Sequence, residues 1–247
     1  MKRTLLIDIS NSFTKVAVAT GPRIGRVHRI PTLEQQPASL CALVGKTKSD
    51  SVFLSSVVPA KNAVVLSAFP QTVTIGPDLD LGVGIDYPNP ESIGADRLAN
   101  AAACAELYGV PAIVVDFGTA VTFDVLSAKR AYIGGVIAPG LNAMTNYLHE
   151  KTALLPQVTL KEPKSAVGRS TRDAMLSGAV HGYRGLIREI LAQITAEKFR
   201  GKKPVVVATG GDAKLIAGKL PLFDKVDPLL TLRGILLIAT KNTAPSF

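Results

Sequence analysis

The sequence predicts an α/β protein made of two related domains that face each other across a cleft. Three observations carry this prediction. Short runs rich in β-branched residues alternate with helical stretches along the chain. A pattern of strand, carboxylate, small loop and strand at residues 5–18 returns at residues 113–126. Of the 247 residues, 47% are apolar, which is enough for one large core or two smaller ones.

The first half of the chain is expected to form mostly strands. The segments concerned carry β-branched residues and are bounded by Gly, Pro or Ser. They are residues 4–9, 15–20, 27–32, 52–58 and 72–75. A helix is expected over 94–108, because its interior, RLANAAACAEL, is rich in Ala and Leu and Gly109 with Pro111 supplies the stop.

The second half begins again with strands, at residues 112–126 and in YIGGVIAPGL. Helices are expected near 142–150, from 170 to about 198 and from 227 to 240, although Gly234 lies inside the last. The stretch VVVATGGDAKLIAG is typical of a strand, a glycine turn and a helix.

The repeated unit aligns Asp8 with Asp116 and Ser10 with Gly118, and each loop carries a small hydroxyl-bearing residue. The two aspartates stand close to half the chain length apart, as expected for two related domains. The alternative is a chance likeness between two β-hairpins.

Hairpins of this kind suit phosphate binding. Gly or small residues at the tip let backbone N–H groups approach phosphate oxygens, and hydroxyls such as that of Thr119 add donors. Lys15 can neutralise a phosphate directly. The carboxylates of Asp8 and Asp116 repel phosphate, so a cation between them and the phosphate is implied. Two such loops predict a nucleoside triphosphate bound from both sides.

Neither of the two commonest nucleotide motifs is present, because the chain has no GxxxxGK[ST] loop and no GxGxxG after a strand. ATGGDA, residues 208–213, places two glycines between a strand and a helix, which suits close approach to a nucleoside or phosphate. The alternative is a plain strand-to-helix turn with Asp212 as its cap.

Between the repeats, Asp96 and Arg97 stand in the first turn of the expected helix. A guanidinium can bind an acid at two points, and a carboxylate can orient or deprotonate an attacking hydroxyl. The pair therefore fits a substrate with both a carboxylate and a hydroxyl. The alternative is that Asp96 caps the helix and Arg97 lies on the surface.

Charge and composition restrict the partners. The net charge is +9, but the basic residues are dispersed without aromatic interleaving, which favours solvated faces over nucleic-acid binding. The apolar runs are far shorter than a membrane span, and Asp8 interrupts the one near the N-terminus, so we expect a cytoplasmic protein. The two cysteines and three isolated histidines do not indicate a disulfide framework or a zinc site.

Five motifs together resemble those of the type III pantothenate kinase family, in the acetate and sugar kinase/Hsp70/actin superfamily. The family's Asp-x-Gly-Asn-Thr-x-x-Lys corresponds to DISNSFTK at 8–15, and its Asp-x-Gly-Thr to DFGT at 116–119. Its Gly-x-Asp-Arg corresponds to GADR at 94–97, preceded by YPNP. GGVIAPGL at 134–141 and STRDAMLSG at 170–178 also match, so the resemblance covers nearly the whole chain.

The resemblance implies two ribonuclease H-like domains of the actin-like ATPase type, each a mixed sheet flanked by helices, with a cleft between them. Residues 1–109 are expected to carry the first phosphate loop and the substrate motif. Residues 110–247 are expected to carry the second phosphate loop, the adenosine side and the dimer contacts. The implied reaction is ATP-dependent phosphorylation of pantothenate to 4′-phosphopantothenate, the first step to coenzyme A.

The resemblance also implies roles for individual residues. Asp96 is expected to be the base for the primary hydroxyl. The residues expected to hold ATP are Asp8, Ile9, Ser10, Asn11, Ser12, Phe13, Thr14, Lys15 and Thr119. Those expected around pantothenate are Tyr87, Gly94, Ala95, Asp96, Arg97 and Thr171. Asp116 is expected to coordinate a monovalent cation, K⁺ or NH₄⁺, and Mg²⁺ to accompany ATP. Family members are homodimers in which Thr171 reaches the substrate across the interface.

Two positions depart from the family pattern, and both lie in the first loop. Ser12 replaces Thr and keeps the hydroxyl, but Ser10 replaces Gly. If Ser10 needs a positive φ, the strain costs about 1 kcal/mol; with a negative φ the cost vanishes. This departure leaves two other functions to consider, a non-enzymatic accessory factor in transcription with the same fold and a kinase for another small hydroxy acid.

Overall fold

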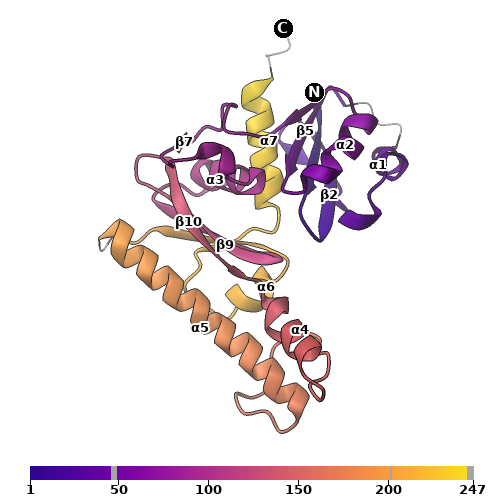
Figure 1. Cartoon of the computed structure of the whole chain (residues 1–247). Coiled ribbons are helices and arrows are strands. Elements are labelled where there is room, and N and C mark those ends of the chain that lie inside the picture. Colours follow the sequence, from indigo (N-terminus) through magenta and orange to yellow (C-terminus); the bar gives the residue numbers. More distant parts are fainter. Residues whose placement is uncertain (46–48, 201, 244–247) are drawn as a thin grey trace. The chain divides into compact units, whose positions relative to one another are not determined.

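The computed structural model describes residues 1–45, 49–200 and 202–243, and Figure 1 traces its elements. The chain forms two compact units. Unit 1 contains Met1–Tyr108, Arg130–Tyr132 and the chain from Leu229 onward. Unit 2 contains Gly109–Lys129 and Ile133–Pro228.

The sheet of unit 1 is built around β1 (Arg3–Ile9). This strand pairs antiparallel with β2 (Phe13–Thr20) and parallel with β5 (Ser51–Ser56). The outer strands are β3 (Arg23–Ile24) and β4 (His28–Pro31), which pair with β2, and β6 (Thr72–Thr74), which pairs with β5. All but the first residue of β1 are buried, as expected of a central strand covered on both faces.

The helical segments of unit 1 are η1 (Thr32–Glu34), α1 (Pro37–Val44), α2 (Pro59–Ala68), η2 (Pro90–Ser92), α3 (Ala95–Leu107) and α7 (Leu230–Asn242). Leu5, Ile7, Leu40 and Val65 belong to one apolar cluster, which joins the sheet to α1 and α2. Helix α7, yellow in Figure 1, packs against α3 and against β1 and β5. Gly234 permits this approach, because a Cβ there would lie only 1.9 Å from the carbonyl oxygen of Ala99.

The sheet of unit 2 is built around β8 (Ala112–Phe117), which pairs antiparallel with β9 (Ala120–Leu126) and parallel with β11 (Val205–Gly210). β10 (Ala131–Pro139) lies next to β9, and β12 (Lys225–Val226) is the edge strand next to β11. The helices are α4 (Leu141–Lys151), α5 (Thr171–Phe199), which is the long orange helix of Figure 1, and α6 (Ala213–Ala217). The core contains Phe117, Phe123, Tyr183 and Ile187.

The strand order confirms the internal repeat. Unit 1 has the order β3-β2-β1-β5-β6, and unit 2 has the matching order β10-β9-β8-β11-β12. Asp8 stands opposite Lys15 in the antiparallel neighbour and Ser55 in the parallel one. Asp116 stands opposite Thr122 and Thr209 in the same two relations. The two aspartates therefore occupy equivalent positions, which a chance likeness of two hairpins would not produce.

The two compact units are not two continuous halves of the chain. Helix α7 belongs to unit 1, because its buried face is covered by α3 and the first sheet. Ala131 and Tyr132, at the start of β10, also belong to unit 1, where they pair with β7 (Gly84–Ile85). None of the described helices combines the length and the apolar character needed to cross a membrane.

Candidate active site

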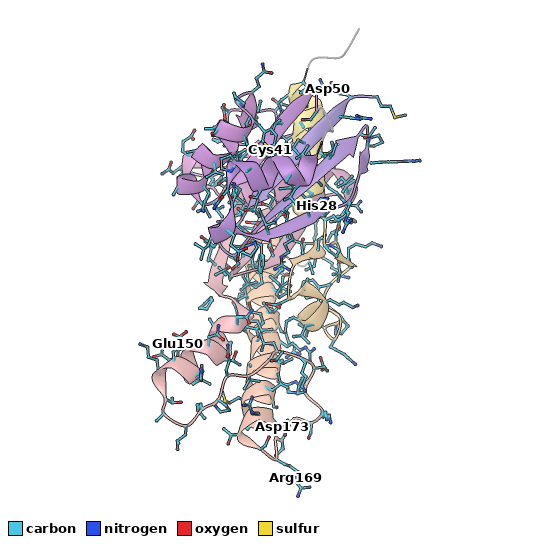
Figure 2. All side chains as sticks on the ribbon, turned by 90° about the vertical axis from the view of Figure 1, so that its right-hand side faces the viewer. His28, Cys41, Asp50, Glu150, Arg169 and Asp173 are labelled. Atoms are coloured by element: carbon cyan, nitrogen blue, oxygen red, sulfur yellow. The ribbon has the colours of Figure 1, made fainter. Side chains whose placement is uncertain are left out.

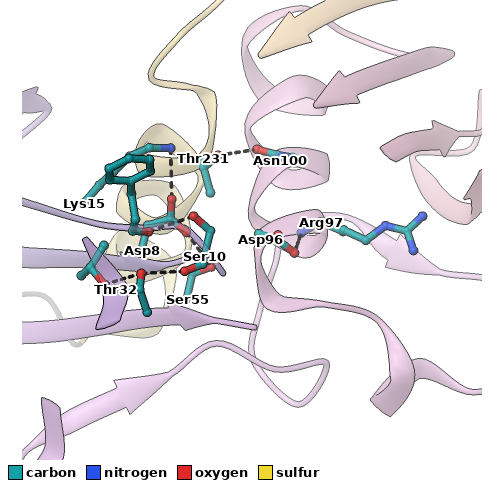
Figure 3. Close-up of polar contacts among 11 residues, drawn as sticks. Asp8, Ser10, Lys15, Thr32, Ser55, Asp96, Arg97, Asn100 and Thr231 are labelled. Atoms are coloured by element: carbon teal, nitrogen blue, oxygen red, sulfur yellow. Dashed lines mark hydrogen bonds and ion pairs between the residues drawn. The ribbon is translucent and has the colours of Figure 1, made fainter. Parts of the chain in front are cut away.

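The loop between β1 and β2 carries the first group of predicted site residues, and Figure 3 shows its surroundings. Asp8 is 3% exposed. One of its carboxylate oxygens lies 3.3 Å from Nζ of Lys15, its cross-strand partner, and the other accepts a long 3.5 Å hydrogen bond from Ser55 Oγ. The charge at the strand end is thus paired rather than solvated, which burial requires. Asn11 and Ser12 at the tip are exposed.

Ser10 fits its position without backbone strain. Among the non-glycine residues that the structure describes, only Arg130 and Arg200 have a positive φ. The backbone N–H and the hydroxyl of Ser10 both donate to the carbonyl oxygen of Phe13, at 3.1 and 2.8 Å. The side chain that replaces glycine therefore closes the hairpin, and the strain of about 1 kcal/mol does not arise.

A buried set of side chains lies beneath this loop. Thr14, Thr32 and Gln35 are all at most 2% exposed. Thr14 Oγ1 lies 3.2 Å from Thr32 Oγ1 and 3.1 Å from Oε1 of Gln35. Thr32 Oγ1 donates to the carbonyl oxygen of Ser10 at 2.7 Å. Ile9 and Thr14, which the family motif includes, are thus buried under the loop.

The second loop, between β8 and β9, lies in unit 2 and exposes Gly118 and Thr119. Its oxygens face glycines. A Cβ at Gly140 would lie 2.3 Å from the carbonyl oxygen of Gly118, and a Cβ at Gly210 would lie 2.5 Å from Oδ1 of Asp116. Gly210 also has a φ of 93°, which favours glycine. Both glycines keep side chains away from the oxygens of this loop.

The turn after β11 adds a further carboxylate beside the second loop. The backbone N–H of Asp212 donates to the carbonyl oxygen of Phe117 at 3.3 Å, and its side chain forms no capping bond to α6. Partial burial raises the pKa of Asp212 above its ordinary value. Burial, with the charge of Asp212 nearby, also raises the pKa of Tyr183, whose hydroxyl donates to the carbonyl oxygen of Pro139.

Asp96 lies at the same edge of the first sheet as the first loop. Helix α3 begins at Ala95, and Oδ1 of Asp96 accepts a 2.8 Å hydrogen bond from the backbone N–H of Arg97. A Cβ at Gly94 would lie 2.7 Å from that oxygen and 3.3 Å from Cγ1 of Val57. Val57 follows β5 and donates its N–H to the carbonyl oxygen of Ile9, at the end of β1. This chain of contacts connects the carboxylate to the strand that leads into the loop.

Arg97 lies over an aromatic pair. Its Cζ is 5.6 Å from the centroid of the Tyr132 ring, and the Tyr87 ring meets Tyr132 edge-on at 5.9 Å. Tyr87 is 37% exposed, whereas Tyr132 is buried. The contact of a guanidinium with an aromatic face orients the cation. Sequence reasoning selected Tyr87 and Arg97 but missed Tyr132, which reaches them through the pairing of β10 with β7.

Thr171, the remaining predicted substrate residue, is exposed at the first position of α5 in unit 2. The helix start is well capped, because Ser170 Oγ accepts from the N–H of Asp173 and donates to its carboxylate at 2.7 Å. Figure 2 labels Asp173 at this helix end and Arg169 in the segment before it. Asp8–Lys15, Tyr87 and Gly94–Arg97 thus belong to unit 1, while Asp116, Thr119 and Thr171 belong to unit 2.

Within residues 1–45, 49–200 and 202–243, no three His, Cys, Asp or Glu side chains gather in a way that could hold a metal ion. A monovalent cation needs no such cluster, because oxygens of any kind serve hard cations. The second loop offers the Asp116 carboxylate and the Gly118 carbonyl, each beside a glycine. These donors fit a cation of that type.

Comparison with known proteins gives a consistent result. The sequence model of type III pantothenate kinases matches residues 4–193. The chain is 47% identical over 244 residues to the type III pantothenate kinase of Akkermansia muciniphila, covering 96% of this chain and 98% of that protein. It is 46% identical over 235 residues to the type III pantothenate kinase of Methylacidiphilum infernorum, covering 95% and 87%.

Two solved structures share the fold at low sequence identity. A Baf family protein from Campylobacter jejuni aligns with a TM-score of 0.63 and 21% identity, over 96% of this chain and 98% of that one. Component A of the (R)-2-hydroxyglutaryl-CoA dehydratase of Acidaminococcus fermentans aligns with a TM-score of 0.55 and 15% identity, over 97% and 96%. The two mixed sheets flanked by helices have the fold shared by actin-like ATPases, sugar kinases and Hsp70.

Proposed function

The chain belongs to the type III pantothenate kinase family, and from this premise we propose which of its residues carry out the reaction. It is a phosphotransferase that phosphorylates pantothenate with ATP, a reaction that belongs to coenzyme A biosynthesis. In the transfer, the oxygen of the pantothenate primary hydroxyl bonds to the γ-phosphorus, the bond to ADP breaks, and the hydroxyl proton leaves. Positioning and charge neutralisation supply most of the rate in such transfers.

Asp96 is the group that we assign to that proton. The single observation that carries this assignment is the contact chain from Asp96 through Gly94 and Val57 to Ile9, which places the carboxylate at the sheet edge where the first loop begins. The N–H of Arg97 fixes one carboxylate oxygen at 2.8 Å. An oriented carboxylate of this kind can accept the hydroxyl proton as the oxygen attacks.

Arg97 is the residue that we assign to the carboxylate of pantothenate. A guanidinium binds a carboxylate at two points, and the rings of Tyr132 and Tyr87 fix its orientation and supply apolar surface. Gly94 and Ala95 complete this side of the proposed pocket, because the helix N-terminus they form carries partial positive charge. The proposed base, Asp96, and the proposed carboxylate-binding residue, Arg97, are thus adjacent on one helix turn.

For ATP, the proposed contacts come from the exposed part of the first loop. Both donors of Ser10 are used inside the hairpin. The proposed phosphate contacts are therefore those of Asn11, Ser12 and Phe13. Lys15 adds a positive charge next to Asp8. Ile9 and Thr14 support the loop from below, and Thr119 in the second loop contributes a hydroxyl. The Gly210–Asp212 turn is the proposed adenosine side.

Two cations belong to the proposal. Asp116 and the Gly118 carbonyl would hold a monovalent cation, K⁺ or NH₄⁺, which supplies positive charge beside the phosphates. Mg²⁺ would accompany ATP, since it favours phosphate oxygens and water over an all-protein cage. Asp8 and Asp116, at equivalent positions of the two repeats, are the acidic groups of the phosphate loops.

A homodimer is also part of the proposal, and unit 2 offers a surface for it. Several large apolar side chains there are exposed on or near α4 and the segment before α5. They are Ile137 (63%), Met144 (37%), Tyr147 (64%), Leu154 (89%) and Val167 (76%). A group of exposed apolar side chains is typical of a protein–protein interface. Thr171 lies close to this group in sequence and would reach the substrate of the partner subunit. We place the enzyme in the cytoplasm, where ATP is supplied.

The test is a direct assay of the purified protein with ATP, Mg²⁺ and pantothenate, in KCl and in NaCl. The proposal predicts equal amounts of ADP and of a phosphate monoester of pantothenate by ³¹P NMR, with faster turnover in KCl. A panel of other small hydroxy acids should give little ADP. Faster turnover of another acid would show that pantothenate is not the preferred substrate. Equal rates in the two salts would contradict the proposed cation site at Asp116.

A further inference from the structure

Thr32, the first residue of η1, binds the first loop at two peptide groups. Its hydroxyl donates to the carbonyl oxygen of Ser10 at 2.7 Å, and its backbone N–H donates to the carbonyl oxygen of Ser12 at 3.1 Å. Thr32 is 1% exposed, so both bonds are shielded from water. Figure 3 shows its side chain next to Ser10. One buried residue therefore fixes two alternate peptide planes.

The orientation of the neighbouring N–H groups follows from the geometry of the peptide bond. In a trans peptide the C=O and N–H groups point in opposite directions, and the loop contains no cis peptide. With the carbonyls of Ser10 and Ser12 turned toward Thr32, the N–H groups of Asn11 and Phe13 are turned away from it. Backbone N–H groups that are not turned toward Thr32 can donate to the oxygens of a bound anion.

We propose that Thr32 is a positioning residue for ATP, because it turns the N–H groups of Asn11 and Phe13 toward the phosphates and keeps two carbonyl dipoles away from them. This inference rests on the proposed function, which assigns the loop to ATP. A loop rotated at either peptide would present an oxygen to the phosphate and repel it. Thr32 does not itself touch the nucleotide.

Counting the hydrogens available for the hydrogen bonds beneath the loop shows that Gln35 also takes part in them. Three contacts join Ser10 O, Thr32 Oγ1, Thr14 Oγ1 and the Gln35 amide, but the two hydroxyls carry only two hydrogens. The third hydrogen must come from the amide. Nε2 of Gln35 is buried and has no partner when Oε1 faces Thr14. With the amide turned by 180°, its NH₂ group donates to Thr14, Thr14 to Thr32, and Thr32 to Ser10, so every contact has its hydrogen.

The experiment compares Thr32→Val, which keeps the shape and removes the hydroxyl, with Thr32→Ser, which keeps the hydroxyl. Thr4→Val is the matched control. Thr4 is also a buried threonine, bonded through its hydroxyl to Ser51 Oγ at 3.2 Å, but it stands at the opposite end of β1. The measurements are the Kd for AMP-PNP by calorimetry without pantothenate, the KM values for ATP and pantothenate, and the unfolding midpoint.

The expected result is a rise of about tenfold in the Kd for AMP-PNP and in the KM for ATP in Thr32→Val, as loss of one buried hydrogen bond predicts. The KM for pantothenate should stay within twofold, and Thr32→Ser should restore ATP binding. A destabilised fold alone cannot produce this split. Thr4→Val should bind AMP-PNP as the wild type does.

Two results would overturn the inference. One is a Kd for AMP-PNP in Thr32→Val no weaker than in Thr4→Val, and the other is an equal rise in both KM values. If Thr32→Val does not fold, Thr32→Ala provides the test, because it also removes the hydroxyl that donates to Ser10; an unchanged Kd there contradicts the proposal. A wild-type protein that binds AMP-PNP but leaves pantothenate unphosphorylated would instead overturn the proposed function.

Discussion

The guanidinium of Arg97 lies over the buried ring of Tyr132, with Cζ 5.6 Å from the ring centroid, although 35 residues separate the two in the chain. Tyr132 holds this position because its carbonyl oxygen accepts from the N–H of Asp86 at 2.8 Å and its strand pairs with β7. The guanidinium of Arg97 is thus oriented by Tyr132, which belongs to unit 1 but lies in a distant segment of the chain. We propose that this planar group binds the carboxylate of pantothenate at two points.

Replacement of Arg97 by Lys should raise the KM for pantothenate by about tenfold or more, because a lysine ammonium does not form the two-point contact. The KM for ATP should stay within twofold. Tyr132→Leu should have the same effect in weaker form, and Tyr132→Phe, which keeps the ring, is its matched control. Steady-state kinetics with each substrate varied will check this. An equal response of both KM values would contradict a carboxylate-binding role.

Ser10→Gly tests whether the serine weakens ATP binding. Since Ser10 has no positive φ and its hydroxyl bonds to Phe13, glycine removes a hydrogen bond and adds freedom to the unfolded chain. We expect the free energy of unfolding to fall by about 1 kcal/mol, with no tighter binding of AMP-PNP. Denaturant unfolding and calorimetry measure both quantities. A lower Kd in the variant would show that the side chain obstructs the phosphates.

Lys15→Met should affect both stability and nucleotide binding. Asp8 has a side-chain exposure of only 4%, and the variant removes its cation. A buried carboxylate left without its charged partner destabilises the fold by about 1–3 kcal/mol. The KM for ATP should rise as well, since a positive charge near the phosphates is lost. Lys15→Arg, which keeps the charge, is the control. Unchanged unfolding in Lys15→Met would show that Ser55 and water suffice for Asp8.

The ion pair of Glu162 with Arg184 predicts a pH dependence of stability. Arg184 is buried in α5, and its two Nη atoms lie 3.0 and 2.7 Å from the carboxylate of Glu162. The hydrogen bonds from Arg184 lower the pKa of Glu162 in the folded protein. The stabilisation is therefore complete above the pKa of a glutamate in the unfolded chain, about 4.3, and is lost as the pH falls through the lower folded value.

Glu162→Gln should accordingly unfold at a lower temperature than the wild type at pH 7, and the difference should shrink below pH 4. Glu150→Gln serves as the control, because it changes a carboxylate to the same amide at a residue that forms no ion pair with Arg184. Glu150 is exposed on α4 and is labelled in Figure 2. Thermal unfolding between pH 3 and pH 7 measures the effect. A constant difference across that range would mean that the charge of Glu162 does not contribute.

The sequence predicted the parts of the fold that depend on local pattern. The strand–carboxylate–loop–strand repeat could be predicted because Asp8 and Asp116 interrupt apolar strands at matching places. The long helix at 171–199 could be predicted because a capping residue precedes a long helical stretch. Helices α1 and α2 were missed, since each begins with a proline, Pro37 or Pro59, which also ends strands and turns. Two-residue strands such as β7 are too short to show the alternation of apolar and polar residues by which strands are predicted.

The candidate site divides in the same way. Asp96 and Arg97 could be selected from their chemistry and from the family motif, because they are neighbours in the sequence. Tyr132 and Thr32 could not, since each reaches the site only through strand pairing or a turn that folds back under a loop. The membership of α7 in unit 1 likewise depends on the Gly234 contact with Ala99, which is a tertiary feature.

The turnover number of Asp96→Asn tests the central assignment most directly. Asparagine keeps an oxygen that can accept the N–H of Arg97, so the helix start should remain intact while the proton acceptor is lost. We predict that kcat for pantothenate falls by about 10²–10⁴-fold, with the unfolding midpoint and the Kd for AMP-PNP unchanged. A kcat within threefold of the wild type would contradict the assignment of Asp96 as the base.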